Sequence, residues 1–421
     1  MPEHPRVLIG GVPFGRNNVG DEAILECVVA IVRELCPSAM VSVSTDDGAV
    51  TAARLGVRTV PLFGFEPPYS REEMRRELAA HDVFLWAGAT GLSDYPAVPT
   101  TMLGLAQAAG RRTVVWNVGM NHELNPVFYR LQPGRRRSAL RLLSGLTLNR
   151  FDAVAWTEHR RQTQARRMIA ERLAAADLVV VRDPESKVEI AKCAPPSPEV
   201  MVGADSALQL QPAAWESLHL PDAVLALLAA SGPKVGVCIS AQREVRNRRG
   251  LLEFLNGVTG ELGARVLFIP MNPVTDAALM VGLRQEMAQP GRAAVLEERY
   301  DPGAILAVAG RLNVILSSRL HLLIFASIVH VPIIGISRGS KVDNFLAPFG
   351  LRAAGSVDDC DFTAVLAETA RLLAGQDAFA TTSRRVRAEL LARLAAAKER
   401  LRAVLVLPPM GRHEKQPRTQ L

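Results

Sequence analysis

Short β-branched apolar runs alternate with amphipathic stretches along almost the whole chain. This alternation is typical of parallel sheets whose strands are joined by crossover helices. Strands are predicted in the first half at Val7–Val12, Met40–Val43, Val83–Ala87, Thr113–Asn117, Leu178–Val181 and Val200–Val202, and in the second half at Val235–Ile239, Val266–Ile269, Val314–Leu316 and Ile333–Ile336. After the first predicted strand, apolar residues recur at helical spacing and predict a helix that buries Ile24, Leu25, Val28, Ile31, Val32 and Leu35.

A strand-poor stretch that contains three prolines separates two similar halves of the chain. The length of 421 residues also fits two or more domains. We therefore expect an α/β protein with two Rossmann-like parallel-sheet domains that face each other across a cleft. The expected segments are an N-terminal domain at 1–210, a linker with one short helix at 211–233, a C-terminal domain at 234–380, a long helix at 381–407 capped by Ser or Thr, and a polar tail at 408–421.

Composition narrows the class of protein. Hydrophobic residues make up 48% and charged residues 22%, which predicts a packed core, and aromatic residues at 5% argue against base stacking and a nucleic-acid partner. Five scattered cysteines without a Cys-x-x-Cys pair predict reduced, mostly buried thiols and no structural zinc. The chain has no apolar run of spanning length and begins directly with a strand-like segment, so we expect neither a transmembrane helix nor a secretory signal, and a cytoplasmic location.

One segment differs from the rest in charge. Residues 130–172 contain eleven arginines and three acids, a net charge of +8, while the whole chain carries +7. One interpretation is peripheral contact with anionic lipid at the inner face of the membrane. The other is a solvated helical hairpin whose arginines pair with local acids.

The first strand leads into the loop Phe14–Ala23, the position where ligands bind in open α/β sheets. This loop has neither a Walker motif nor a Gly-x-Gly-x-x-Gly motif. The acids Asp21 and Glu22 would repel a phosphate at the helix N-terminus, so Asp21 suits hydroxyl groups better. Capping of the helix is the structural alternative for Asp21.

Two further strands of the second half end in polar residues. Ser317, Ser318, Arg319 and His321 follow the strand at 314–316 and precede an apolar helix. Arginine offers a planar fork for a carboxylate or phosphate, and histidine can supply a proton near neutral pH. Both interrupt an apolar context, in which burial without purpose is costly. The structural alternative is a core histidine with satisfied hydrogen bonds beside a structural arginine.

The next strand, at 333–336, is followed by a glycine turn and Lys341, and in the first half Arg182 ends the strand at 178–181. Structural alternatives remain for these residues: Lys341 as a surface residue of a first helical turn, and Asp183 as the cap of a helix that begins at Pro184.

Together these elements resemble the polysaccharide pyruvyl transferase family. The elements are Asn18-Val19-Gly20-Asp21-Glu22, Arg182-Asp183-Pro184-Glu185-Ser186, Ser317-Ser318-Arg319-Leu320-His321 and Lys341-Val342-Asp343. The resemblance covers most of the chain and implies a two-domain fold like that of the GT-B glycosyltransferases, with phosphoenolpyruvate as donor. The implied acceptor is a sugar of a cell-surface polysaccharide or exopolysaccharide, or of its lipid-linked oligosaccharide precursor.

The resemblance implies catalytic roles for Arg182, Arg319 and His321 at the donor. It also implies substrate contacts by Lys341, Asn18, Gly20, Asp21, Ser317 and Ser318. Asp94 is a further candidate for substrate binding, and we expect no metal and no cofactor. In this hypothesis His321 protonates the methylene carbon of phosphoenolpyruvate and the two arginines hold its carboxylate and phosphate. Asp21 and Asp94 would orient acceptor hydroxyls.

The chain departs from the family pattern in the loops Ala87–Asp94 and Trp116–His122 and at Arg338, which leaves the acceptor open. One alternative is a GT-B sugar-nucleotide glycosyltransferase, for which Glu297 or Glu298 would bind ribose. Another is a non-catalytic protein that binds an anionic glycan or a membrane surface through residues 130–172.

Overall fold

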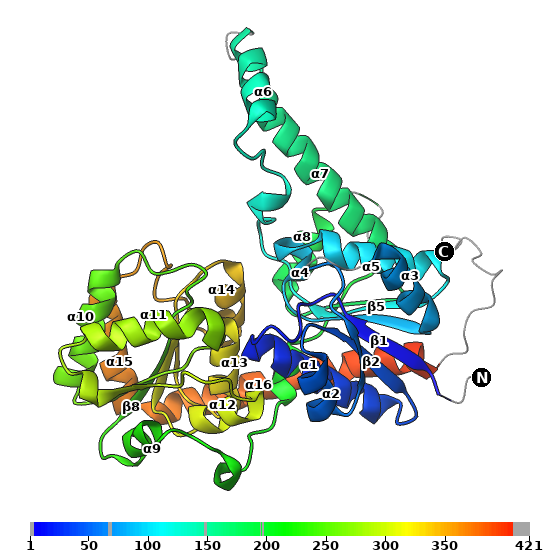
Figure 1. The fold of residues 1–421 in the computed structure, drawn as a ribbon. Coiled ribbons are helices and arrows are strands. Elements are labelled where there is room, and N and C mark those ends of the chain that lie inside the picture. The colour runs from blue at the N-terminus through cyan, green and yellow to red at the C-terminus, as the bar shows by residue number, and fades with distance from the viewer. Residues whose placement is uncertain (1–3, 66–69, 147–149, 194, 196–197, 407–421) are drawn as a thin grey trace. The chain divides into compact units, whose positions relative to one another are not determined.

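The structure, a computed structural model, describes residues 4–65, 70–146, 150–193, 195 and 198–406. The chain divides into two units, each with its own parallel sheet (Figure 1). Unit 1 comprises Met1–Pro13, Val29–Gly203 and Ala396–Leu421, and unit 2 comprises Phe14–Val28 and Ala204–Ala395. The main passage between them, at 203–204, lies close to the expected boundary at 210, while the sequence pattern does not reveal that residues 14–28 belong to unit 2. The expected tail at 408–421 lies outside the described residues.

The sheet of unit 1 has seven parallel strands in the order β3-β2-β1-β4-β5-β6-β7. The strands are β1 (Arg6–Gly10), β2 (Met40–Thr45), β3 (Arg58–Pro61), β4 (Val83–Ala87), β5 (Arg112–Val118), β6 (Leu178–Val181) and β7 (Met201–Val202). Continuous apolar runs suit these strands because helices cover both faces of a parallel sheet. Six of the seven were predicted. The edge strand β3 was missed because it is only four residues long and begins with polar Arg58 and Thr59.

The helices of unit 1 include most of the crossovers between these strands. They are the second half of α1 (Val19–Leu35), α2 (Gly48–Leu55), α3 (Arg71–Ala80), α4 (Gly91–Asp94), α5 (Ala97–Ala108), η1 (Pro126–Phe128), α6 (Arg135–Leu146), α7 (Ala153–Ala174) and α8 (Pro184–Ala191). The predicted apolar face of α1 is confirmed, since all six of its residues are buried.

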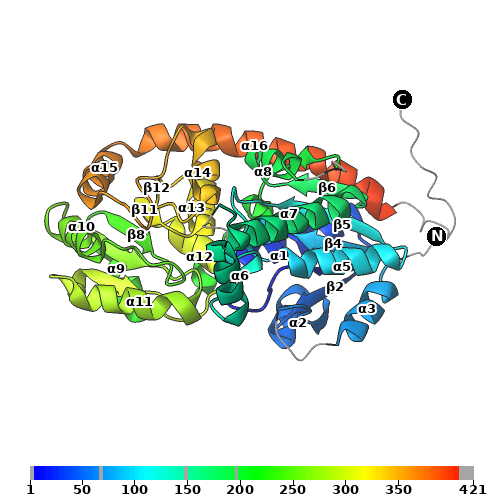
Figure 2. The same ribbon diagram turned by 90° about the horizontal axis from the view of Figure 1, so that it is seen from above.

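Helices α6 and α7 form a hairpin that stands out from the sheet of unit 1 (Figure 1). Near the start of α7 the carboxylate of Glu158 accepts from the backbone N–H of Leu131 at 2.9 Å. The C-terminal end of α7 is anchored in unit 1, where Ile169, Ala170 and Leu173 are buried and α7 packs beside α5 (Figure 2). There the side-chain amide of Gln107 donates to the carbonyl of Arg172 at 2.9 Å. The basic segment at 130–172 is therefore a helical hairpin.

The sheet of unit 2 has five parallel strands in the order β10-β9-β8-β11-β12. They are β8 (Lys234–Cys238), β9 (Arg265–Phe268), β10 (Ala293–Val295), β11 (Val314–Ser317) and β12 (Ile333–Gly335). Four of the five were predicted, and the three-residue edge strand β10 was missed. The expected linker holds η3 (Trp215–Ser217) and α9 (Asp222–Ala229).

The remaining helices follow the strands of unit 2. They are η2 (Ser206–Gln209), α10 (Arg248–Gly260), α11 (Pro273–Glu286), η4 (Pro290–Arg292), α12 (Pro302–Ala309), α13 (Leu320–Ile328), α14 (Ser340–Leu346), η5 (Ala347–Phe349), α15 (Phe362–Ala374) and α16 (Gln376–Val406). The prediction that Ser or Thr caps the last helix was wrong, because α16 begins earlier than expected. Ser383 lies inside it, where its hydroxyl donates to the carbonyl of Ser327 at 2.7 Å.

Each strand order reverses direction once, between β1 and β4 in unit 1 and between β8 and β11 in unit 2. Ligands of open α/β sheets bind outside the carboxyl ends of the strands at such a reversal. In unit 2 the two strands end at Cys238 and Ser317, and β11 directly precedes residues singled out in the sequence. The topology thus places Arg319 and His321 where a ligand is expected.

All five cysteines are buried and none forms a disulfide, as predicted. Burial raises the pKa of the Cys238 thiol to about 12 and keeps it protonated. No helix in the described part of the chain combines the length and apolar character needed to cross a bilayer.

Candidate functional site

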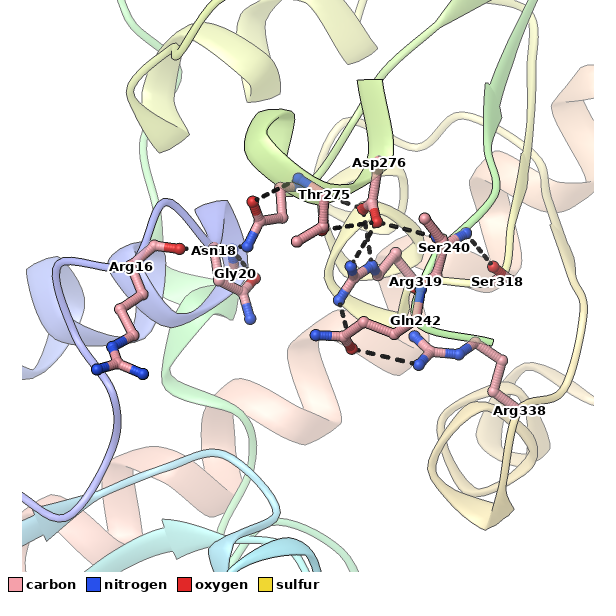
Figure 3. Close-up of polar contacts among 12 residues, drawn as sticks. Arg16, Asn18, Gly20, Ser240, Gln242, Thr275, Asp276, Ser318, Arg319 and Arg338 are labelled. Atoms are coloured by element: carbon pink, nitrogen blue, oxygen red, sulfur yellow. Dashed lines mark hydrogen bonds and ion pairs between the residues drawn. The ribbon is translucent and has the colours of Figure 1, made fainter. Parts of the chain in front are cut away.

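The candidate site of unit 2 is built from three strand ends and the loop before α1 (Figure 3). Gln242 follows β8, Asp276 follows β9 and Arg319 follows β11. Gln242 bridges two cations, since its carbonyl oxygen lies 3.4 Å from Nη1 of Arg319 and 3.4 Å from Nη2 of Arg338. Neighbouring parallel strands carry these residues to one edge of the sheet.

Arg319 is held by a buried carboxylate. Its Nε donates to Oδ2 of Asp276 at 3.0 Å and its Nη2 donates to Oδ1 at 2.7 Å. Asp276 is fully buried, and its oxygens also accept from the hydroxyl of Thr275 and the backbone N–H groups of Ala241 and Asn272. Because this pair occupies one edge of the guanidinium fork, a ligand can reach Arg319 only through the Nη1 and Nη2 edge.

The two serines before Arg319 shape the turn. The hydroxyl of Ser317 accepts from the backbone N–H of Arg319 at 2.9 Å and donates to its carbonyl at 2.7 Å. The hydroxyl of Ser318 accepts from the backbone N–H of Ser240 at 3.0 Å, which ties β11 to β8. Both serines are fully buried, so their predicted contact with a substrate rests on the sequence resemblance alone.

The loop before α1 is fixed by its own side chains. Asn18 caps the helix, because its Oδ1 accepts from the backbone N–H of Gly20 at 3.2 Å. The capping role considered for Asp21 is therefore wrong: Asp21 lies within the first turn and accepts from the Asn18 amide at 2.7 Å. Glu22 holds the loop from the other side, where its carboxylate accepts from the backbone N–H of Gly15 at 2.7 Å.

His321 packs directly against this loop. A Cβ atom at Gly20 would lie only 2.0 Å from Nδ1 of His321, so no side chain other than hydrogen fits there. On the other side of the ring, Nε2 lies 3.7 Å from Oδ2 of Asp205. Nε2 is buried and makes no hydrogen bond within the described residues. An imidazole is a group that can supply a proton to a substrate as a general acid.

The pKa of the Asp21 carboxyl depends on burial and on the charged residues around it. The pKa of Asp21 is raised to about 6, mainly by burial and also by the negative charge of Glu22, while the positive charges of His321, Lys341 and Arg319 act in the opposite direction. His321 contacts Gly20, the residue before Asp21, and Arg319 precedes His321 by two positions, so the structure brings these residues together; the charge of Lys341 also acts on the Asp21 carboxylate. Lys341 lies in the first turn of α14, half-buried.

Arg182 belongs to unit 1, where it ends β6. Its guanidinium is 8% exposed, and Nε donates to Asp183 at 3.3 Å. Asp183 caps α8 as predicted, by accepting from the backbone N–H of Ser186 at 2.7 Å. A Cβ at Gly119 would lie 2.5 Å from Nη2 of Arg182, which explains the glycine after β5.

Asp94 also belongs to unit 1, at the end of the short helix α4. Its carboxylate accepts from the hydroxyl of Thr90 and from the side-chain amide of Asn121, the latter at 3.0 Å. It joins the two loops in which the chain departs from the family pattern.

Sequence reasoning missed three residues of the unit 2 site: Asp205, Gln242 and Asp276. In the sequence each resembles an ordinary residue of a loop or of a first helical turn. Asp276 and Arg319 are 43 positions apart, so their contact produces no recognisable pattern in the local sequence. One signal was available, because a buried arginine at a strand end requires a carboxylate partner. Within the described residues no group of three or more His, Cys, Asp or Glu is arranged to hold a metal ion.

Solved structures share the fold at low sequence identity. Anabaena Alr3699/HepE in complex with UDP has a TM-score of 0.56 and 10% identity, over 94% of this chain and 99% of that chain. A UDP-glucosyltransferase from Polygonum tinctorium has a TM-score of 0.55 and 13% identity, over 96% and 99%. S. aureus MnaA with UDP has a TM-score of 0.56 and 9% identity, over 90% of both chains. The expected fold class, two parallel-sheet α/β domains like those of GT-B glycosyltransferases, is confirmed.

Sequence comparison identifies the family. No curated protein gave a significant match. The family model described as polysaccharide pyruvyl transferase matches residues 18–340, a range that begins at Asn18 and includes Arg182, Arg319 and His321. This match spans more than half of the chain, and the four motifs lie at the strand ends and helix starts described above. The chain therefore belongs to the polysaccharide pyruvyl transferase family and is a transferase.

Proposed function

We propose that the protein transfers the pyruvyl group of phosphoenolpyruvate to two hydroxyls of one sugar. The sugar belongs to a cell-surface polysaccharide or to its lipid-linked precursor, and the products are a pyruvate ketal and phosphate. The observation that carries the proposal is the group of Arg319, His321, Lys341 and Asp21 at the reversal point of the unit 2 sheet, in a chain of this family.

The donor suits the charges of unit 2. Phosphoenolpyruvate carries a carboxylate and a phosphate on a small carbon frame, so its site needs directed cations. The Nη1 and Nη2 edge of Arg319, where Nη1 donates to Gln242 at 3.4 Å, is proposed to bind the carboxylate or phosphate, with Lys341 as a second cation. Asp276 supports this role because it fixes the direction of the guanidinium before the donor arrives.

The reaction balances without an additional reactant. His321 donates a proton to the methylene carbon, and the enol C2 becomes electrophilic as the double bond is lost. One sugar hydroxyl adds to C2 and loses its proton, the C2–O bond to phosphate breaks, and the second hydroxyl adds and closes the ring. One of the two hydroxyl protons restores the imidazolium and the other leaves with phosphate. Asp205 is proposed to stabilise the charged imidazole, and Asp21 to bind an acceptor hydroxyl.

Donor binding by Arg182 is a separate proposal that rests on the sequence resemblance, and acceptor binding by Asp94 is another that rests on its carboxylate in the loop Ala87–Asp94 of unit 1. The position of Arg182 at the carboxyl end of β6 favours a functional role, since ligands of open α/β sheets bind outside the carboxyl ends of the strands. An Arg182→Lys enzyme tests the first proposal through its KM for phosphoenolpyruvate, which should rise.

The deciding experiment measures phosphate release from phosphoenolpyruvate with envelope glycans or lipid-linked oligosaccharides from a strain that lacks the gene. We expect release that depends on both substrates and mass spectrometry that shows the ketal on the glycan. A thermal-shift comparison adds a binding readout, because a ligand at about 100 Kd contributes about 2.7 kcal/mol of stability. Stabilisation by phosphoenolpyruvate and not by UDP-glucose is expected. The reverse result would favour a sugar-nucleotide glycosyltransferase. The carboxylates that would bind ribose in that case, Glu297 and Glu298, are exposed.

A further inference from the structure

The outer face of helix α6 carries exposed apolar side chains. Ser144 and the half-buried Arg137 and Leu140 lie on the side that meets α7. Ala139, Leu142, Leu143 and Leu146, at positions i, i+3, i+4 and i+7, form one stripe on a different side of the helix. Leu142 is 73% exposed and Leu146 is 83% exposed, values that the fold of unit 1 alone leaves unexplained.

Positive charge accompanies this stripe. At a helical spacing of about 100° per residue, Arg135 and Arg136 flank its N-terminal end, and Arg141 lies on the opposite side. Within the described residues the four arginines of α6 form no ion pair with a carboxylate. In the described part of the segment 130–172 the ion pair is that of Arg167 with Glu171. The alternative that the arginines are neutralised by local acids therefore does not hold for α6.

Aromatic residues lie at the start of α7, which follows the C-terminal end of the α6 stripe. Phe151 and Trp156, at the start of α7, are 44% and 51% exposed and contact each other, with ring centroids 6.1 Å apart. Arg160 lies over the Trp156 ring at 5.5 Å. Exposed tryptophan beside arginine and leucine is typical of helices that lie in the interface of a bilayer.

We propose that the exposed face of α6, together with Phe151, Trp156 and Arg160, is a docking surface for an anionic phospholipid bilayer. The leucine stripe enters the boundary between headgroups and acyl chains, and Arg135 and Arg136 contact the headgroup phosphates. A second copy of the chain fits this surface less well, since two facing stripes would bring the α6 arginines of both copies together. The inference does not depend on the proposed reaction.

The test uses the full chain and sucrose-loaded vesicles, either of phosphatidylcholine alone or of equal parts phosphatidylcholine and phosphatidylglycerol. We expect the protein to sediment with the anionic vesicles and to be released when salt rises from about 0.1 M to about 1 M, which shortens the Debye length to about 3 Å. Absence of binding, or equal binding to both vesicles, would overturn the proposal.

Two pairs of substitutions locate the surface. Arg135→Ala with Arg136→Ala should lower the partition coefficient about 30-fold, at about 1 kcal/mol per arginine. The matched control Arg384→Ala with Arg393→Ala removes the same charge from exposed positions of α16 and should leave the partition coefficient unchanged. Leu142→Glu with Leu146→Glu should abolish binding, while Val274→Glu, at a position 74% exposed on α11, should not.

Circular dichroism and thermal unfolding check that the variants fold. Vesicle binding that survives in both α6 variants contradicts the proposal. Sedimentation velocity identifies the competing occupant: a wild-type dimer that becomes monomeric with Leu142→Glu and Leu146→Glu would assign the stripe to self-association and overturn membrane docking.

Discussion

Gly20 and His321 lie in direct contact, with the imidazole of His321 in the space that a side chain at residue 20 would need. Two motifs about 300 positions apart in the sequence are thus parts of one surface in unit 2. The glycine of the Asn-x-Gly-Asp loop is required by the histidine rather than by the backbone alone. The addition of one methyl group at residue 20, as in Gly20→Ala, therefore tests whether the position of the imidazole matters for catalysis.

Gly20→Ala should displace the His321 ring. Because the new Cβ would lie 2.0 Å from Nδ1, the ring must move, and we expect a large loss of kcat together with a stability cost of about 1–3 kcal/mol from overpacking. Gly291→Ala is the control, since a Cβ added at Gly291 would have no atom within 4 Å. Wild-type kcat in Gly20→Ala would mean that the position of His321 does not matter for catalysis.

His321→Ala should abolish protonation of the donor while donor binding persists. The expected decrease in kcat is about 10²–10⁴-fold, the usual contribution of a general acid. Phosphate release measures kcat, and the thermal shift with phosphoenolpyruvate measures binding. Release at the wild-type rate in the presence of acceptor would remove the acid role from His321.

Asp205→Asn should lower kcat and leave the donor KM nearly unchanged. The substitution keeps the size of the side chain and its cap on η2, where Oδ1 accepts from the backbone N–H of Ala207 at 3.0 Å. It removes the charge that is proposed to stabilise the imidazolium, so a loss of about tenfold or more is expected, a part of the general-acid contribution. An equal effect in a background that already carries His321→Ala would show that Asp205 does not act through the histidine.

Arg319→Lys should raise the donor KM and also lower stability. Lysine cannot reproduce the two parallel hydrogen bonds to Asp276, so the buried carboxylate loses a partner at a cost of about 1.5–3 kcal/mol. We expect a similar loss in donor binding, which is roughly a tenfold to hundredfold rise in KM. Arg249→Lys, at a position 90% exposed on α10, is the control. An unchanged KM would exclude Arg319 from the donor site.

Stability should depend on pH through Asp21. Burial raises its pKa from 3.8 to about 6, so the folded chain binds this proton more tightly than the unfolded chain does. The contribution of Asp21 to the free energy of unfolding is therefore complete below about pH 4 and is lost as pH rises through about 6. Asp21→Asn should then be more stable than wild type at pH 7 to 8, by up to about 3 kcal/mol, with no difference below about pH 4.

The same titration predicts a pH effect on the reaction. If the Asp21 carboxylate accepts from an acceptor hydroxyl, the wild-type acceptor KM should rise as pH falls through about 6, and Asp21→Asn should show no such rise. Urea unfolding across this pH range gives the stability, and steady-state kinetics gives the KM. Parallel stability curves for the two proteins would contradict the raised pKa.

The sequence predicted ten of the twelve strands because inner strands of parallel sheets are continuous apolar runs. The edge strands β3 and β10 are short, so pattern alone could not separate them from loops. Arg319 and His321 were found because polar residues after an apolar run are conspicuous. Asp276 and Asp205 were not, since their importance depends on which strand ends become neighbours, and the order β9-β8-β11 is fixed by topology.

Helices α1 and α16 each pass from one unit into the other without a break, at residues 28–29 and 395–396. Neither unit is therefore encoded by one uninterrupted stretch of the gene. A recombination event at residue 204 would exchange one sheet but leave the loop with Gly20 behind, separated from its own histidine. Hybrids made to alter the sugar that is modified must therefore carry residues 14–28 together with 204–395, and evolution of this chain meets the same restriction.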